Sequence, residues 1–194
     1  MLDSLQKALQ EQIRDLYSAE GQLVNALPRM AKAASSEALR EAFTSHLGET
    51  REHVKRLQSI AEMLECKPGG KKCKAMEGLI EEGKEVLGED GAEAVIDVAL
   101  IAAAQRVEHY EIAAYGTARA MAEKLGLPKV AELLQMTLDE EGAADKTLTG
   151  ISEDEVLSAA AEAGGSEEGT SGRSGKSRIS SGAGASRKSH GRGA

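Results

Sequence analysis

The 194-residue sequence contains few aromatic residues and few residues that would interrupt a helix. It has no tryptophan, one phenylalanine, three tyrosines and three prolines. No apolar run approaches the ~20 residues that a helix needs to span a bilayer. The N-terminal segment MLDSLQKALQEQIRDLY lacks the basic, apolar and small-residue regions of a signal peptide. These absences, together with many alanine, leucine, glutamate and lysine residues, predict a helical protein of the cytoplasm with no membrane span.

Cysteine is also scarce, since only Cys66 and Cys73 occur, in the segment CKPGGKKC. Two thiols alone make a poor zinc site, although a disulfide across the Pro-Gly-Gly turn is sterically conceivable. Thiols of cytoplasmic proteins are usually reduced. We therefore expect two free cysteines, and the sequence assigns a role to neither.

Acidic residues are absent from the last part of the chain. The formal net charge is −8, but residues 169–194 contain six basic and no acidic residues, which leaves 18 basic and 32 acidic residues upstream, a net of about −14. Residues 164–194 are rich in glycine and serine, a composition that favours disorder. We expect a helical domain at residues 1–163 and a disordered tail at 164–194. The tail has no aromatic residue for stacking on bases, so it would solubilise the protein or bind nucleic acid weakly and without sequence preference.

Apolar residues recur at helical spacing in four long segments, near residues 2–30, 36–64, 92–121 and 128–148. Short links join the first segment to the second and the third to the fourth. The middle connection is long and contains a shorter helical segment, AMEGLIEEGKEVLG. This order predicts an all-α four-helix bundle with a long crossover that contains a short extra helix.

The first helix pair resembles the second. A shift of 91 residues without a gap lays Leu9 on Leu100, and it also lays Glu20 on Glu111 and Glu49 on Glu140. The repeat predicts two similar helical hairpins related by a pseudo-two-fold axis. Such an arrangement would bring carboxylates from four helices together.

Each long helix carries potential metal ligands part-way along its apolar stripe. Spacings of three or four residues stack side chains on one helical face. A buried carboxylate is costly unless it is paired or bound to a cation, and helical bundles hold two metal ions with such side chains. Carboxylate and imidazole ligands without cysteine suit iron(II) or manganese(II). We expect two iron or manganese ions, held by Glu20, His46, Glu49, Glu108, Glu111, Glu141 and Asp145.

Two positions near this cluster have competing interpretations. His53 follows at helical spacing, but its charged neighbours favour a solvated face, and we interpret it as exposed. The repeat pairs Glu49 with Glu140, whereas the apolar stripe favours Glu141. We favour Glu141, because burial is what makes a carboxylate require a cation.

Five motifs distributed along the chain together resemble the YciE/YciF family of bacterial stress proteins. They are LYSAEGQL, HLGET, AMEGLIEE, ALIAAAQRVEHYEIAAYGT and TLDEEGAADKTL. The resemblance extends from about residue 2 to residue 157. It implies a ferritin-like, rubrerythrin-type bundle, a homodimer and a di-metal centre at the seven positions above. Better-known ferritin-like sites carry Glu-x-x-His twice, whereas this chain has His46-x-x-Glu49 in the second helix and ends the fourth with Asp145.

The leading functional hypothesis is a di-metal stress protein that consumes peroxide or oxidises iron, with a small-molecule oxidant as its partner. Tyr17 and Tyr110, near Glu20 and Glu111 in the sequence, could then serve as electron donors or hydrogen-bond partners. We favour the other interpretation, in which both are aromatic residues at the edge of the core with satisfied hydroxyls. Two other classes stay open. One is a structural metal-binding protein without turnover, and the other is a DNA-associated protein that acts through its basic tail.

Overall fold

The computed structural model describes residues 2–165, and every regular element in that range is helical. Four long helices form a ferritin-like bundle, which confirms the predicted fold class. They are α1 (Leu5–Ala33), α2 (Glu37–Met63), α4 (Glu93–Lys124) and α5 (Pro128–Ile151). The predicted extra helix of the crossover is α3 (Lys74–Val86). Apart from its first two residues, the tail predicted at 164–194 lies outside the described residues.

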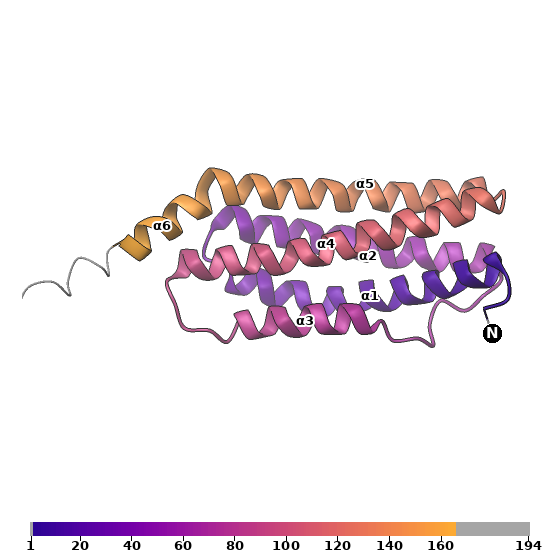
Figure 1. Cartoon of the computed structure of the whole chain (residues 1–194), viewed down its shortest axis with the longest axis horizontal. Coiled ribbons are helices and arrows are strands. Elements are labelled where there is room, and N and C mark those ends of the chain that lie inside the picture. The colour runs from indigo at the N-terminus through magenta and orange to yellow at the C-terminus, as the bar shows by residue number, and fades with distance from the viewer. Residues whose placement is uncertain (1, 166–194) are drawn as a thin grey trace, which may run out of the picture.

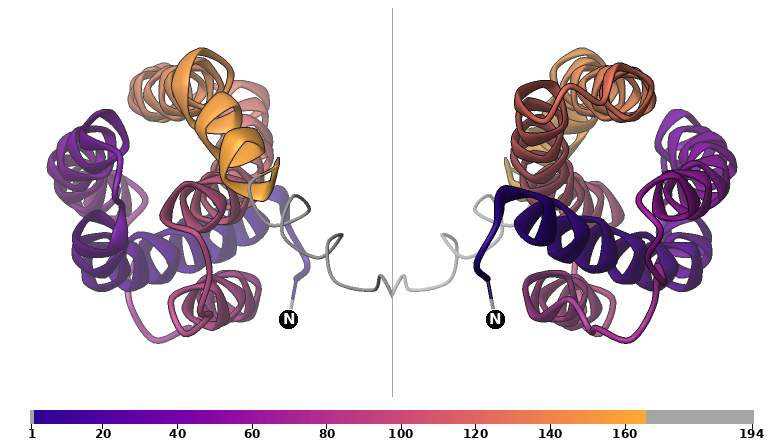
Figure 2. Two further views of the ribbon diagram at one scale, coloured as in Figure 1. Left: turned by 90° about the vertical axis from the view of Figure 1, so that its left-hand side faces the viewer. Right: turned by 90° about the vertical axis from the view of Figure 1, so that its right-hand side faces the viewer.

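The bundle consists of two antiparallel hairpins, α1–α2 and α4–α5 (Figure 1). α2 packs against α5, and α1 packs against α4, so the four long helices surround one common core (Figure 2). The crossover from α2 to α4 runs the length of the bundle, and its helix α3 packs on the outside, against α1 and α4. Each long helix therefore packs against its partner in the hairpin and against one helix of the other hairpin.

A buried carboxylate from the second hairpin holds the short link of the first hairpin. Ser36 is the N-cap of α2, and its Oγ accepts a hydrogen bond from Leu39 N at 3.3 Å. Asp97 of α4 accepts hydrogen bonds from Ser35 N at 3.0 Å, Ser35 Oγ at 2.5 Å and Ser36 N at 2.7 Å. Two backbone amides that the helices leave unpaired are thereby satisfied.

Glycine is required at the link between α4 and α5. Gly126 has φ +70°, a left-handed conformation that glycine adopts without a steric penalty. Gly126 N donates to Glu123 O and Leu127 N to Ala122 O, both at 3.0 Å, which closes the last turn of α4. Pro128 then begins α5, where its missing N–H costs no helical hydrogen bond.

The core contains two apolar clusters, each built from all four long helices. One includes Leu23, Phe43, Leu100 and Leu148. The other includes Leu9, Leu57, Ala118 and Leu134. Along α1, α2, α4 and α5, the side chains that are buried between these clusters are mostly polar. The apolar clusters thus enclose a polar layer at mid-length.

The C-terminal end of the bundle extends beyond the last predicted helix. A π-helical turn (Ser152–Val156) follows α5 directly and leads into α6 (Leu157–Gly165), which bends away from the bundle axis (Figure 1). Val156 is buried in the same apolar cluster as Leu148. The run SEDEV contains one apolar residue, Val156. A single apolar residue forms no periodic pattern, so this turn could not be predicted from the sequence.

Two further features bear on the expectations from composition. Both cysteines are free thiols, Cys73 buried at the start of α3 and Cys66 half-buried. Within residues 2–165, no helix is both long enough and apolar enough to cross a membrane.

We predict that Asp97→Asn lowers the free energy of unfolding by about 2 kcal/mol, because an amide cannot accept all three hydrogen bonds and leaves a buried donor unsatisfied. Urea denaturation followed by circular dichroism measures the change. Asp90→Asn, in the exposed loop before α4, is the matched control and should change little. Equal stability of the two variants would contradict this role of Asp97.

Candidate metal centre

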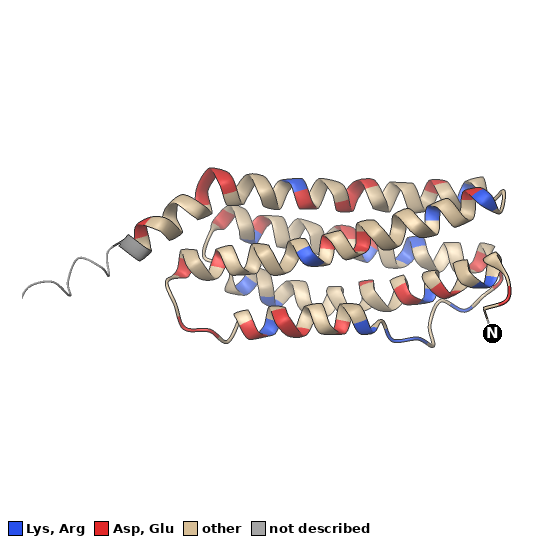
Figure 3. Cartoon of the chain, in the orientation of Figure 1, with Lys and Arg blue, Asp and Glu red and all other residues tan. Residues whose placement is uncertain are grey.

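The polar layer between the apolar clusters contains four glutamates and two histidines. α1 contributes Glu20, α2 contributes both histidines, α4 contributes two glutamates and α5 contributes one. All six are buried: Glu20, His46, His53, Glu108, Glu111 and Glu141. In Figure 3 acidic residues occur part-way along α4 and α5 as well as near the helix ends. The layer has potential ligands from every long helix.

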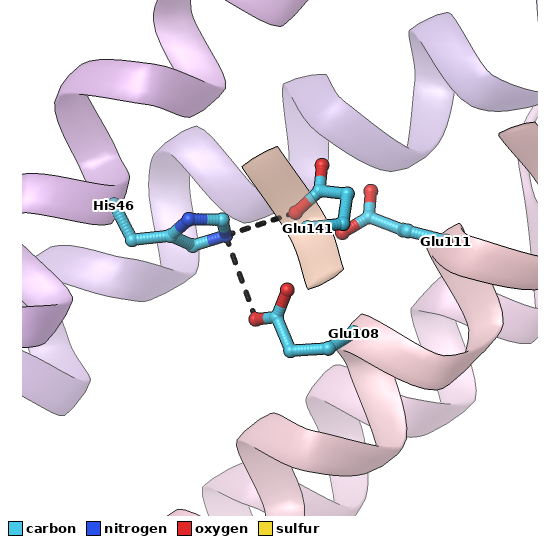
Figure 4. A group of neighbouring side chains, drawn as sticks. All are labelled: His46, Glu108, Glu111 and Glu141. Atoms are coloured by element: carbon cyan, nitrogen blue, oxygen red, sulfur yellow. Dashed lines mark ion pairs between the residues drawn. The ribbon is translucent and has the colours of Figure 1, made fainter. Parts of the chain in front are cut away.

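Four of these side chains form one group, shown in Figure 4. The ligand atoms of His46, Glu108, Glu111 and Glu141 all lie within 4.8 Å of one another. His46 Nε2 is 3.5 Å from Glu108 Oε1 and 3.6 Å from Glu141 Oε2. The four side chains point toward one another, so a single cation could contact all of them.

A second group forms beside the first and shares one residue with it. Glu20, His53 and Glu141 also offer ligand atoms within 4.8 Å of one another. His53 Nδ1 lies 3.4 Å from Glu20 Oε1 and 3.0 Å from Glu141 Oε1. Glu141 therefore turns one oxygen toward His53 and the other toward His46, the position of a carboxylate that could bridge two ions.

Most of the inward-facing atoms have no hydrogen-bond partner within the described chain. Eight buried ligand atoms of the layer are in this state: Glu20 Oε2, His46 Nε2, His53 Nδ1, Glu108 Oε2, both oxygens of Glu111 and both oxygens of Glu141. His53 Nδ1 is close to Glu141, but without hydrogen-bond geometry. Buried polar groups are nearly always satisfied, and each that is not costs about 1–3 kcal/mol. Oxygen and imidazole donors in this arrangement fit iron(II) or manganese(II).

Each histidine uses its outward nitrogen to contact a glutamate outside the layer. His46 Nδ1 is 3.2 Å from Glu49 Oε2, and His53 Nε2 is 2.9 Å from Glu140 Oε2. Arg56 holds Glu140 through two hydrogen bonds, of 2.7 and 3.2 Å. A carboxylate that accepts the N–H of one ring nitrogen leaves the other nitrogen free for a metal. Glu49 and Glu140 thus orient the two imidazoles.

A buried tyrosine supports the second group. Tyr115 of α4 has no exposed surface, and its hydroxyl donates a hydrogen bond to Glu20 Oε1. The other carboxylate oxygen, Oε2, is buried and has no hydrogen-bond partner within the described residues. Tyr115 therefore holds Glu20 in a fixed orientation.

Burial and mutual contact shift the pKa values of the layer. Burial raises the pKa of Glu20, and it raises those of Glu108 and Glu111 well above the usual range, because nothing in the described part of the chain compensates the charged form fully.

The pKa values of the two histidines are raised as well. Burial opposes the charged form of His46, but the contacts with Glu49, Glu108 and Glu141 outweigh it and raise its pKa to about 9. For His53 the contacts with Glu141 and Glu20 likewise outweigh burial and raise the pKa to about 10. All of these pKa shifts are upward, so without a metal the layer holds protons more tightly than the same side chains do in water.

The structure brings five of the seven predicted ligands together and leaves two outside the buried groups. Glu49 is exposed, and its carboxylate contacts the outer nitrogen of His46. Asp145 is half-buried, accepts a hydrogen bond from Gln105 Nε2 at 3.1 Å and lies 3.4 Å from His109 Nε2. Glu49 follows His46 by three residues and Asp145 follows Glu141 by four, so each is turned by ~40–60° from that ligand around its helix. Whether a side chain displaced by this angle is buried depends on how its helix is rotated against its neighbours.

The interpretation of His53 as solvent-exposed is wrong, since this side chain is fully buried in the second group. The sequence contained the signal. Buried residues of α2 recur at alternating intervals of three and four, at Phe43, His46, Thr50, His53 and Leu57. Charged neighbours along the sequence outweighed this spacing in our interpretation. The preference for Glu141 over Glu140 agrees with burial, because Glu141 is fully buried and Glu140 is 36% exposed.

Both tyrosines have bonded hydroxyls, which agrees with the favoured interpretation and not with a role beside Glu20 and Glu111. Tyr17 accepts a hydrogen bond from Gln58 near the surface, and Tyr110 donates to Asp15 at 2.6 Å and contacts Cys73. Neither contacts the layer, which Tyr115 does. Tyr115 was not predicted, although it follows Glu111 by four residues on the same face of α4.

Comparisons with known proteins identify close relatives. Residues 4–161 match a family model described as a domain of unknown function (DUF892). Protein YciF of Escherichia coli (strain K12) is 50% identical over 140 residues, which cover 72% of this chain and 84% of that protein. The crystal structure described as the E. coli stress protein YciF superposes with a TM-score of 0.77 at 46% identity, covering 80% of this chain and 98% of that chain. YcfI from Rhodopseudomonas palustris superposes with a TM-score of 0.74 at 42% identity, covering 76% and 94%.

The raised pKa values predict that the metal-free protein loses stability as the pH rises. For Glu108 and Glu111 the folded-state pKa lies above the usual 4.5, so their contribution is complete below pH 4.5 and is lost as the pH rises through the raised values. For His46 and His53 it is complete below pH 6.5 and lost through about 9 and 10. We expect the melting temperature of metal-free protein to fall steadily between about pH 5 and about pH 10, as measured by calorimetry.

The variant Glu111→Gln tests the cause of this pH dependence, because the amide keeps the volume of the side chain but cannot ionise. The metal-free variant should melt above the wild type at about pH 8, with a weaker dependence on pH. Manganese(II) should raise the melting temperature of the wild type at this pH, since ligand binding to the folded state is stabilising. A wild-type melting temperature that does not vary with pH would contradict the assigned burial of these carboxylates.

Proposed function

The chain belongs to the DUF892 family, and we propose that it is a stress-associated ferritin-like protein whose bundle core holds two iron or manganese ions. The family description assigns no activity, so the proposal rests on the chemistry of the site. Its relative YciF is described as a stress protein. The finer statements about metal and reaction are inferred from the residues of this chain.

The observation that carries the proposal is the set of eight unpaired ligand atoms that converge from four helices. If all four buried carboxylates are ionised and both histidines are neutral, as metal binding requires, the layer carries four negative charges in an apolar surrounding. Such an arrangement is strongly unfavourable without cations. Two divalent ions would neutralise the layer and satisfy the unpaired atoms.

The two groups suggest how the ions would be shared. His46, Glu108 and Glu111 would hold one ion, and Glu20 and His53 would hold the other. Glu141 belongs to both groups and would contact both ions. The outer glutamates and Tyr115 would keep these ligands in place, as outer partners do in other metal sites.

The proposed reaction is the reduction of a small oxidant. When bound, two iron or manganese ions supply one electron each, and two electrons with two protons convert one hydrogen peroxide into two waters. The chain itself excludes bulk water with the two apolar clusters and keeps the ligands oriented. Repeated turnover would need an external one-electron reductant. Iron oxidation is the same electron transfer with iron(II) as the substrate.

Three further expectations remain proposals. They are a homodimer, a cytoplasmic location and weak binding of nucleic acid by the basic tail. Nearly all of the tail lies outside residues 2–165, so its role rests on composition alone.

We predict that purified protein loaded with iron(II) or manganese(II) retains about two ions per chain. The double variant Glu20→Ala with Glu111→Ala should lose nearly all of this metal, because each group loses a carboxylate. Elemental analysis measures the metal, and circular dichroism checks that helicity survives. The matched control replaces Glu52 and Glu132 by alanine, two exposed glutamates on α2 and α5. Wild-type metal content in the first variant would show that the site is elsewhere.

We also predict that iron(II)-loaded protein consumes hydrogen peroxide faster than metal-free protein, by at least about tenfold, a barrier difference of about 1.4 kcal/mol. The Glu52/Glu132 control should keep this rate, and the Glu20/Glu111 variant should lose it. Peroxide loss is followed with an electrode. Full metal content with no faster consumption would favour the alternative function, a metal-binding structural protein without turnover.

A further inference from the structure

The two ends of the buried polar layer differ in their access to solvent. Glu20 and His53 have no exposed surface, whereas Glu108 is 3% and His46 is 6% exposed. The outer side of His53 is covered by Glu140, which Arg56 clamps in place. The end of the layer at Glu20 and His53 is closed, and the end at His46 and Glu108 lies close to the surface.

A cavity of about 110 Å³ lies at the open end, between α2 and α5. His46 and Glu108 form its buried wall, and small side chains, Ala42 of α2 with Ala143 and Ala144 of α5, form its sides. One water occupies about 30 Å³ in the liquid, so the cavity has room for a ligand of a few heavy atoms. In the part of the chain that the structure describes, neither Glu20 nor His53 lines this cavity.

The internal repeat gives a physical reason for this asymmetry. The shift of 91 residues pairs His53 of α2 with Ala144 of α5. On the closed side the imidazole of His53 fills the space beside the layer. At the related position on the other side, alanine leaves that space empty. The missing side chain is therefore what opens one end of the layer and not the other.

We propose that a small uncharged ligand, of the class of hydrogen peroxide, enters between α2 and α5 and binds beside His46 and Glu108. The inference rests on the proposed function, because it assigns the two metal positions different roles. The ion held by His46, Glu108 and Glu111 would be open to an external ligand, whereas the ion held by Glu20 and His53 would be enclosed by the protein.

The lining of the cavity defines the class of ligand. Glu49 lies at the mouth of the cavity, with 46% of its side chain exposed. Among the residues that the structure describes, no lysine or arginine lines the cavity. A carboxylate at a narrow entrance repels anions and has little effect on neutral molecules. The sides of the cavity are mostly apolar, which suits molecules without charge. The size and the charge together favour small neutral oxidants over anionic ones.

The test uses nitric oxide, a neutral diatomic probe whose binding to iron(II) gives an electron paramagnetic resonance signal. Ala144→Leu places a larger side chain in the cavity without changing a ligand. In iron(II)-loaded protein, this variant should bind nitric oxide more slowly than the wild type by about tenfold or more, a barrier increase of at least about 1.4 kcal/mol. Ser45→Leu, at the cavity wall on α2, is a second variant with the same expected result in case the first does not fold. Ala75→Leu, exposed on α3, is the matched control and should bind at the wild-type rate.

Iron content is measured in every sample, so the two proposals can fail separately. Full iron content with slower nitric oxide binding in the cavity variants supports the entry path. Full iron content with equal rates in the variants and the wild type overturns it, while the metal site stands. A wild-type protein that holds no iron overturns the metal site and the entry path together.

Discussion

The burial of four carboxylates and two imidazoles at one level of a helical bundle is the constraint on which the rest of this structure depends. An apolar bundle core disfavours these groups unless they are paired or bound to a cation. The chain therefore encloses the layer between two apolar clusters that supply the packing energy the layer cannot. Contacts at the margin then hold the imidazoles and Glu20 in place, through Glu49, Glu140 and Tyr115.

The repeat and the apolar stripe indicated different ligands in the fourth helix because they report different shells of the same site. The positions that the repeat pairs as Glu49 and Glu140 are both outer partners of a histidine. The stripe indicated Glu141, which is fully buried. Each of the two related hairpins thus has one outer glutamate, whereas both histidines of the buried layer come from the first hairpin. This loss of symmetry leaves one end of the layer open to a cavity.

Much of the candidate site was accessible from spacing alone. A glutamate at the centre of an apolar stripe, such as Glu20 or Glu111, is a strong signal because helical periodicity fixes its direction. Positions displaced from the stripe were harder, since Glu49 and Asp145 deviate from it by only a fraction of a turn. His53 lay on the stripe, but its charged sequence neighbours suggested exposure. Sequence neighbours on a helix point in different directions, so they were a poor guide to its burial.

The sequence by itself determined the helices, their order and the pairing of hairpins, because helical periodicity, caps such as Ser36 and breakers such as Gly126 act over a few residues. It also determined that potential ligands from four helices would lie at matching depth. Only the tertiary structure decided which oxygen faces which nitrogen, that Glu141 is shared, and that Tyr115 rather than Tyr17 or Tyr110 supports the layer. Those features depend on how far each helix is rotated and shifted against its neighbours. Packing of side chains across the whole bundle sets these rotations, and no local pattern contains them.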